Sequence, residues 1–159
     1  MGKDKDKTNV MWILDRHKIS YRHFGYDSDG THTGVEIADM LNEDADRVFK
    51  TLVTEGKAGE YYVFVIPVGC ELDLKKAAKA VGSKAVHMVK SKELLPLTGY
   101  IHGGCSPIGM KKTFTTVIHE SAEKYDTIMF SAGKIGYQVE VSPDDLNRVI
   151  KYSYADVVC

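Results

Sequence analysis

A glycine-rich segment, Thr98–Gly109, carries the densest chemical signal in the chain, with the sequence TGYIHGGCSPIG. Four glycines, a serine and a proline within it exclude a strand or a helix interior. Glycine lets a ligand approach bare backbone N–H groups, so such a loop can cradle an anion or form an oxyanion hole. It is not a Walker loop, because no Gly-Lys-Ser/Thr follows, and it lacks the strand-to-helix context of a dinucleotide-binding loop. A purely structural turn is the alternative.

Two further sites combine a lysine with groups that could bind a ligand. Lys50 stands in an apolar, strand-like run, and alternation places it on the face of Val48 and Leu52. If this is the inner face of a sheet, Lys50 is a functional cation; otherwise it is an edge-strand lysine that opposes aggregation. Ser131 and Lys134 flank a glycine turn, for which an ordinary hairpin is the better explanation in isolation.

Lysines are concentrated between residues 74 and 119, where eight of them accompany a single acid, Glu93. Clustered lysines favour a nucleic-acid backbone because neutralised phosphates release counterions. A solvated helix face with a flexible loop is the other interpretation. The eight are Lys75, Lys76, Lys79, Lys84, Lys90, Lys92, Lys111 and Lys112.

Other reactive residue types give weak signals. The six histidines lack the close spacing of metal ligands, so we expect neither a metal nor a cofactor. Cys105 and His102 lie three residues apart in the loop, but no further residue is in place to orient a catalytic base. Ser106 lacks the Gly-x-Ser-x-Gly pattern of a nucleophile elbow.

Apolar periodicity predicts helices that alternate with hairpins rather than with single parallel strands. This order favours an α+β fold with a mixed sheet or small barrel flanked by helices. In the helix over 33–41, Val35, Ile37, Ala38 and Leu41 are expected to face inward. The other predicted helices cover 8–17, 71–81, a short segment that Ser91 caps and Pro96 closes, and a final helix after Ser142. The predicted strands cover 20–24, 47–54, 61–68, 85–89, 115–119, 127–131 and 137–141.

The bulk composition is that of one globular domain. With 159 residues the chain is long enough for a single core, and residues 1–7 have the charged composition of a disordered terminus. We expect no membrane span, since no apolar run approaches 18 residues, and no secretory signal. Three widely spaced cysteines suit a reducing compartment, so the expected location is the cytoplasm.

Taken together, these motifs resemble the YbaK/EbsC family of aminoacyl-tRNA deacylases, which is similar to the editing domain of some prolyl-tRNA synthetases. The resemblance extends from about residue 7 to about residue 157. The matching segments, in order, are TNVM (8–11), YD (26–27), VFKTL (48–52), VIP (65–67), LDLKKAA (72–78), TGY (98–100), GGCSPIGMKK (103–112), DTI (126–128) and SAGK (131–134).

The resemblance implies a mixed six-stranded β-barrel with surrounding helices and one key catalytic lysine, Lys50. It also implies that the loop Gly104–Gly109 holds the aminoacyl ester. Relatives often have arginine where this chain has Ile135, which weakens the case for a second cationic contact there. The substrate-binding candidates are Tyr26, Gly103, Gly104, Ser106, Pro107, Gly109 and Ser131. The candidate tRNA contacts are Lys75, Lys76, Lys79, Lys111, Lys112 and Lys134.

The implied activity is trans-editing of Cys-tRNA(Pro), and of Cys-tRNA(Cys) as a second substrate. In cysteine-specific members the substrate thiol attacks its own ester, which explains why no protein nucleophile is evident. The alternatives are a deacylase for Ala- or Ser-tRNA that uses water, and a non-catalytic module that binds tRNA or a synthetase. The expected partners are the tRNA acceptor end and prolyl-tRNA synthetase, with the protein as a monomer or weak dimer.

Overall fold

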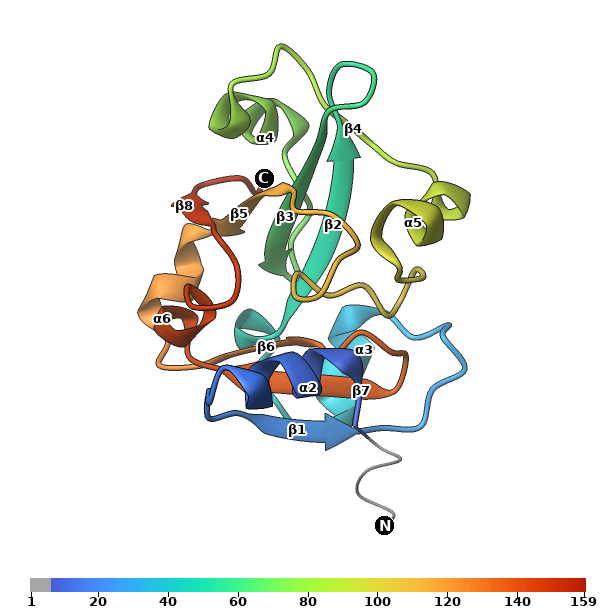
Figure 1. Ribbon diagram of the computed structural model, residues 1–159, viewed down its shortest axis with the longest axis vertical. Coiled ribbons are helices and arrows are strands. Elements are labelled where there is room, and N and C mark those ends of the chain that lie inside the picture. Colours follow the sequence, from blue (N-terminus) through green and yellow to red (C-terminus); the bar gives the residue numbers. More distant parts are fainter. Residues whose placement is uncertain (1–6) are drawn as a thin grey trace.

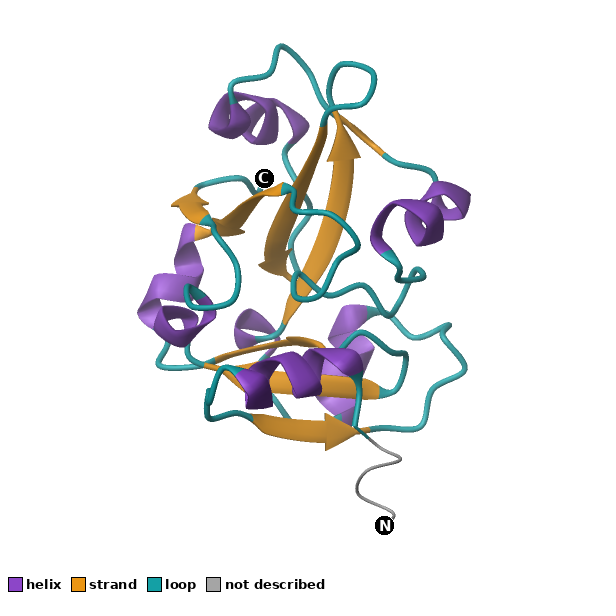
Figure 2. Ribbon diagram, in the orientation of Figure 1, coloured by secondary structure: helices purple, strands orange, loops and turns teal. Residues whose placement is uncertain are grey.

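Short helices surround two β-sheets in the computed structural model, which describes residues 7–159 (Figures 1 and 2). The predicted disorder of the N-terminus falls on residues outside this range, apart from Lys7, whose ammonium pairs with Asp15. The helices are α2 (Asn9–Arg16), α3 (Gly34–Met40), α4 (Leu74–Val81), α5 (Ser91–Thr98) and α6 (Pro143–Leu146), with 3-10 turns η1 (Ala45–Arg47) and η2 (Glu120–Lys124). The strands are β1 (Arg22–Gly25), β2 (Phe49–Glu55), β3 (Tyr61–Pro67), β4 (His87–Met88), β5 (Thr115–His119), β6 (Ile128–Ser131), β7 (Tyr137–Val141) and β8 (Ser153–Ala155).

The two sheets differ in size and in strand direction. The smaller sheet has the order β1-β7-β6 and is antiparallel throughout. The larger has the order β4-β2-β3-β5-β8 and is mixed, because β5 runs parallel to both β3 and β8. A bridge between Val48 and Met129 links the start of β2 to β6, so the two sheets meet at this point.

The predicted α+β class, with mixed strands flanked by helices, is confirmed. Both predicted hairpins are present, as β2–β3 and as β6–β7. Within residues 7–159 eight strands form two sheets joined at Val48, where the resemblance implied six strands. Strand β8 was not predicted, since Ser153–Ala155 is too short to show a period.

Capping residues explain most helix boundaries. The Thr8 hydroxyl accepts the Met11 N–H at the start of α2, and Thr33 and Glu36 form a reciprocal capping box on α3. Gly82 ends α4 in the left-handed conformation that a residue with a side chain seldom adopts.

Three local predictions were wrong. Helix α5 is capped by Lys90, with Ser91 as its first residue, and it does not end at Pro96 but continues through it to Thr98. Proline removes only one hydrogen-bond donor, and in so short a helix that loss is tolerated close to its end. Val35 was expected to face inward but is 40% exposed, because α3 packs through Ile37 and Ala38 instead.

The largest apolar core joins both sheets. It combines α2 with residues of β2, β3, β5, β6 and β7, and with Tyr100 and Ile108 of the glycine-rich loop. A second cluster packs α4 against β3 and β5, and a third packs α3 against Val48, Val68 and Met129. Across residues 7–159, no helix has the length and apolar character that a membrane crossing requires.

Candidate functional site

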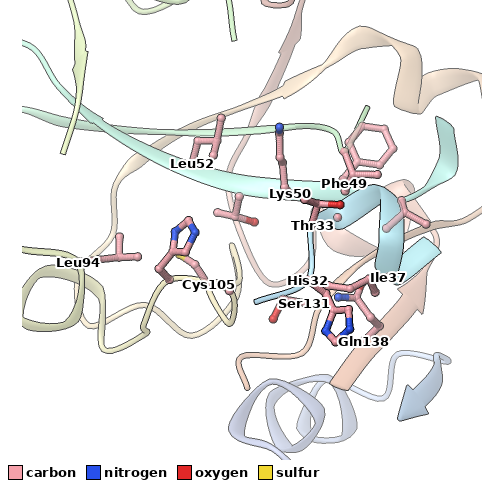
Figure 3. A pocket seen from close by; sticks show the side chains of 16 residues that line it. His32, Thr33, Ile37, Phe49, Lys50, Leu52, Leu94, Cys105, Ser131 and Gln138 are labelled. Carbon is pink, nitrogen blue, oxygen red and sulfur yellow. The ribbon is translucent and has the colours of Figure 1, made fainter. Parts of the chain in front are cut away.

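A cavity of about 440 Å³ lies where the two sheets meet (Figure 3). Six parts of the chain form its wall: strand β2, the start of α3, the residue after β3, helix α5, the glycine-rich loop, and the β6–β7 hairpin. Much of the lining is apolar, from Ile37, Val48, Phe49, Val68 and Leu94. Such a concave apolar wall with a few polar groups is the usual form of a small-ligand site.

Three of the residues predicted from the sequence line this cavity together: Lys50, Gly103 and Ser131. They come from β2, the loop and the end of β6, so only the tertiary fold brings them together. The Ser131 hydroxyl accepts the Gly133 N–H at 3.1 Å, which holds the turn of the β6–β7 hairpin.

Lys50 stands at the rim of the cavity. Strand β2 holds it opposite Ile66 in the β2–β3 ladder, and its side chain is half-buried. In Figure 3, Lys50 and Leu52 extend from one side of β2, whereas Cys105, Ser131 and Gln138 lie on the other. Over the described residues 7–159, Lys50 forms no ion pair with a carboxylate. Its ammonium charge is therefore not neutralised by a carboxylate of the described chain.

The glycine-rich loop divides into a part that lines the cavity and a part that packs beneath it. Gly103 and Cys105 line the cavity, and Gly103 has a φ of +90°. A β-carbon on Gly104 would lie 3.1 Å from the backbone nitrogen of Ile135, so only glycine lets the loop lie so close to the hairpin turn. The Gly104 N–H is already bonded to the Ile101 carbonyl, at 3.0 Å.

The end of the loop, from Ser106 to Gly109, does not reach the cavity lining. Ser106 is fully buried, and its hydroxyl accepts the Ile108 N–H at 3.4 Å. The Tyr100 hydroxyl donates to the Ile108 carbonyl, which fixes the loop from the inside. Pro107 is buried in the same segment. In this arrangement Ser106, Pro107 and Gly109 are not part of the cavity lining.

Tyr26 lies in a separate groove of about 560 Å³ between the end of β1 and the β6–β7 turn. Ile135 forms part of this groove and packs toward Gly30 and Gly103, where β-carbons would lie 3.0 and 3.5 Å from its side chain. At the position where relatives often have arginine, this chain thus has an apolar contact between two loops.

Two buried polar atoms of the cavity lining have no hydrogen-bond partner: Thr51 Oγ1 and Gln138 Oε1. Gln138 is 5% exposed and pairs with Ser131 across β6 and β7. Unpaired buried polar atoms cost free energy, and both of these atoms lie beneath the solvent-accessible surface of the cavity wall. Sequence analysis identified neither Thr51 nor Gln138 as a site residue. The available signal was a glutamine between Tyr137 and Val139 in a strand that is otherwise mostly apolar and buried.

The remaining reactive side chains of the lining are Cys105, His32 and His102. Burial raises the pKa of the Cys105 thiol to about 12, so this thiol stays protonated at neutral pH. His32 Nδ1 forms a hydrogen bond with Ser28 Oγ at 2.8 Å. Among residues 7–159, no three side chains of histidine, cysteine, aspartate or glutamate gather as metal ligands.

The lysine-rich stretch does not form one patch. Figure 1 shows α4, with Lys75, Lys76 and Lys79, on the opposite side of the β2–β3 hairpin from α5. Lys76 is engaged within the protein, because its ammonium lies 3.0 Å from an Asp156 carboxylate oxygen. Lys134 is exposed and lies over the Tyr137 ring, 5.4 Å from its centroid.

Comparisons with known proteins agree with this geometry. A family model described as the aminoacyl-tRNA editing domain matches residues 28–149. The "Putative Cys-tRNA(Pro)/Cys-tRNA(Cys) deacylase EbsC" of Enterococcus faecalis is 44% identical over 156 residues, which are 98% of this chain and 95% of that protein.

Two solved structures share the fold. One, a "putative trans-editing enzyme for prolyl tRNA synthetase", has a TM-score of 0.80 at 23% identity and covers 94% of each chain. The other, the hypothetical protein APE2540, has a TM-score of 0.86 at 24% identity, over 96% of this chain and 100% of that one.

Proposed function

Since the chain belongs to the aminoacyl-tRNA editing domain family, we propose that it deacylates mischarged Cys-tRNA(Pro), with Cys-tRNA(Cys) as a second substrate. The substrate assignment follows the 44% identical relative. The observation that carries the proposal in the structure is the cavity itself, which Lys50, Thr51 and Gln138 line together with apolar side chains.

These groups match the parts of an aminoacyl ester on the terminal nucleotide. Lys50 at the rim binds the terminal nucleotide through its phosphate or ribose. The Gln138 amide oxygen is an acceptor for the substrate α-ammonium, which needs a partner once it leaves water. Thr51 can donate to or accept from the ribose hydroxyl that carries no amino acid. The apolar side chains of the wall then surround the cysteine side chain.

The backbone N–H groups of the glycine-rich loop are the proposed stabilisers of the oxyanion. Gly103 and Cys105 line the cavity, and within residues 7–159 neither N–H donates to another backbone carbonyl. Donors already in place where negative charge develops stabilise the transition state without reorganisation. Ser106 supports this role indirectly, since its hydroxyl holds the loop from below.

The proposed nucleophile is the thiol of the substrate. Its sulfur forms a bond to the ester carbonyl carbon as the C–O bond to the ribose breaks. The thiol proton is passed on to the ribose oxygen, so that the products are free tRNA and a cyclic cysteine thiolactone. Holding sulfur and carbonyl in attack geometry supplies much of the acceleration. Cys105 is unsuited to this step because burial raises its pKa to about 12.

Two other functions remain to be distinguished. A deacylase for Ala- or Ser-tRNA would need a water as nucleophile, and a non-catalytic binding module would need no oxyanion site. Lys50 together with the cavity-lining loop favours catalysis over simple binding. We further propose that the protein acts in the cytoplasm, as a monomer or weak dimer, with prolyl-tRNA synthetase as a second partner.

The test is to incubate the purified protein with tRNA(Pro) charged with Cys, Ala or Ser, and with Cys-tRNA(Cys). We expect rapid loss of cysteine, a rate that rises toward the free thiol pKa of about 8.5, and thiolactone as the released product. Fit alone separates near-isosteres such as cysteine and serine by only about 10- to 200-fold. Free cysteine released directly, at the rate of serine release, would show that water is the nucleophile.

A further inference from the structure

The lysines of the stretch 74–119 form two groups, and we infer that tRNA binds only the group beside α5, which comprises Lys90, Lys92, Lys111 and Lys112. This inference rests on the proposed function, because it concerns how the tRNA acceptor end reaches the same cavity. Figure 1 shows α4 and α5 separated by the β2–β3 hairpin, so a single acceptor stem meets one side first.

The α5 side adjoins the cavity, whereas α4 contributes nothing to its lining. Leu94 of α5 lines the cavity, and so do His102 and Gly103, which follow α5 in the chain and are exposed. The Lys111 N–H donates to the Thr98 carbonyl at 3.0 Å, which holds this lysine at the end of α5. A cation here lies at the C-terminal end of the helix that contributes Leu94 to the cavity.

The four lysines beside α5 are exposed and free to bind phosphates. In the described part of the chain, none of them forms an ion pair. The nearby acid, Glu93, accepts the backbone N–H of Lys90 at 3.1 Å and so serves to cap the helix. Helix α5 has eight residues and is about 12 Å long, so lysines at its two ends can contact successive phosphates rather than one.

On the α4 side, a tertiary contact neutralises one of the lysines, Lys76. The C-terminal segment lies against the start of α4, where the Asp73 N–H donates to the Val157 carbonyl at 2.8 Å. This brings Asp156 within 3.0 Å of Lys76, whose ammonium also donates to the Val158 carbonyl at 2.8 Å. Asp73 caps α4 as Glu93 caps α5, by accepting the Lys75 and Lys76 N–H groups. Lys75 and Lys79 have no ion-pair partner within residues 7–159, but α4 contributes no residue to the cavity lining.

The test measures the affinity for uncharged tRNA(Pro) as a function of salt concentration, with three double alanine variants. The first removes Lys111 and Lys112, the second removes Lys75 and Lys79, and the third removes Lys124 and Lys151 as a control of equal charge. Each lost phosphate contact should lower the slope of log affinity against log salt by about 0.7–0.9. We expect the slope to fall by about 1.5 for the first variant. A protein with Lys111→Arg and Lys112→Arg should keep the slope of the unaltered protein, and so should the other two alanine variants.

A flatter slope for the α4 variant than for the α5 variant would overturn the inference, as would equal slopes for all three or no binding by the unaltered protein. The assay is independent of catalysis. Binding that depends on Lys111 and Lys112 without any deacylation would refute the proposed function and leave the surface assigned. Deacylation that is unchanged by the loss of either lysine pair would refute the assigned surface and leave the proposed function standing.

Discussion

At the scale of single residues, Lys50 is the cation whose loss tests the site. Among residues 7–159, Lys50 is the only lysine or arginine that lines the cavity, so in Lys50→Ala kcat/KM should fall by about 100-fold or more through loss of a charged contact. Lys50 forms no ion pair in the described chain, so the melting temperature should hardly change. A lower kcat/KM with an unchanged melting temperature would place Lys50 in the site. An unchanged kcat/KM would show that Lys50 is not part of it.

Gln138 provides a second test at this scale. Gln138→Met keeps the volume but removes the amide oxygen that has no partner in the protein. Loss of a hydrogen bond to a charged group should lower kcat/KM by about 10- to 100-fold, which corresponds to about 1.5–3 kcal/mol. The folded state should be unchanged or slightly more stable, because an unsatisfied buried group has gone. A clear loss of stability in urea would instead assign Gln138 a structural role.

At the scale of elements, α3 is positioned by the close approach of Gly34 to Val68, the residue that follows β3. A β-carbon on Gly34 would lie 2.5 Å from Val68 Cγ1, closer than any real contact. Gly34→Ala should therefore destabilise the protein by about 1–3 kcal/mol and raise KM, since Gly34 and Val68 both line the cavity.

The matched control for this contact is Val68→Gly, alone and combined with Gly34→Ala, because the Val68 β-carbon would itself lie 2.6 Å from the added β-carbon. If the steric clash is the cause, the double variant should be less destabilised than the sum of the two single variants. Strictly additive free energies of unfolding in urea would mean that the two residues do not constrain each other.

At the scale of the whole molecule, a polar network fastens the two sheets together. Arg47, just before β2, donates to a Glu140 carboxylate oxygen on β7 at 2.9 Å and to the Thr127 carbonyl at 3.2 Å. Glu140 is 8% exposed. Glu140→Gln should cost about 2–3 kcal/mol, because it leaves a partly buried guanidinium without its counter-charge. The exposed pair of Asp145 with Arg148 is the control, and Asp145→Asn should cost under about 0.5 kcal/mol.

The same experiment tests our proposal that the chain folds as one domain. The single tryptophan, Trp12, lies on α2 beside the smaller sheet, while far-ultraviolet circular dichroism reports on all elements. Because the main core joins both sheets, the two signals should change together in urea, with and without Glu140→Gln. Separate transitions would contradict a single cooperative unit.

The sequence by itself determined most of the helices and hairpins, and it identified the family and with it the class of reaction. Caps such as Thr33 and Gly82, and the hairpins, depend on neighbouring residues, so periodicity and turn chemistry suffice to find them. Motifs around Lys50 and the glycine-rich loop identified the family, because its members share short segments at set distances. Which loop residues line the cavity could not be read in this way, and Ser106 is fully buried within the loop.

Only the tertiary structure decided which groups meet. Thr51 and Gln138 belong to strands of different sheets, so no sequence spacing relates them, yet both end in one cavity with unpaired polar atoms. The lysines that are continuous in sequence are divided by the β2–β3 hairpin, and Asp156, some 80 residues away, neutralises Lys76. Burial, charge balance and cavity lining depend on long-range packing, and local patterns carry no information about such contacts.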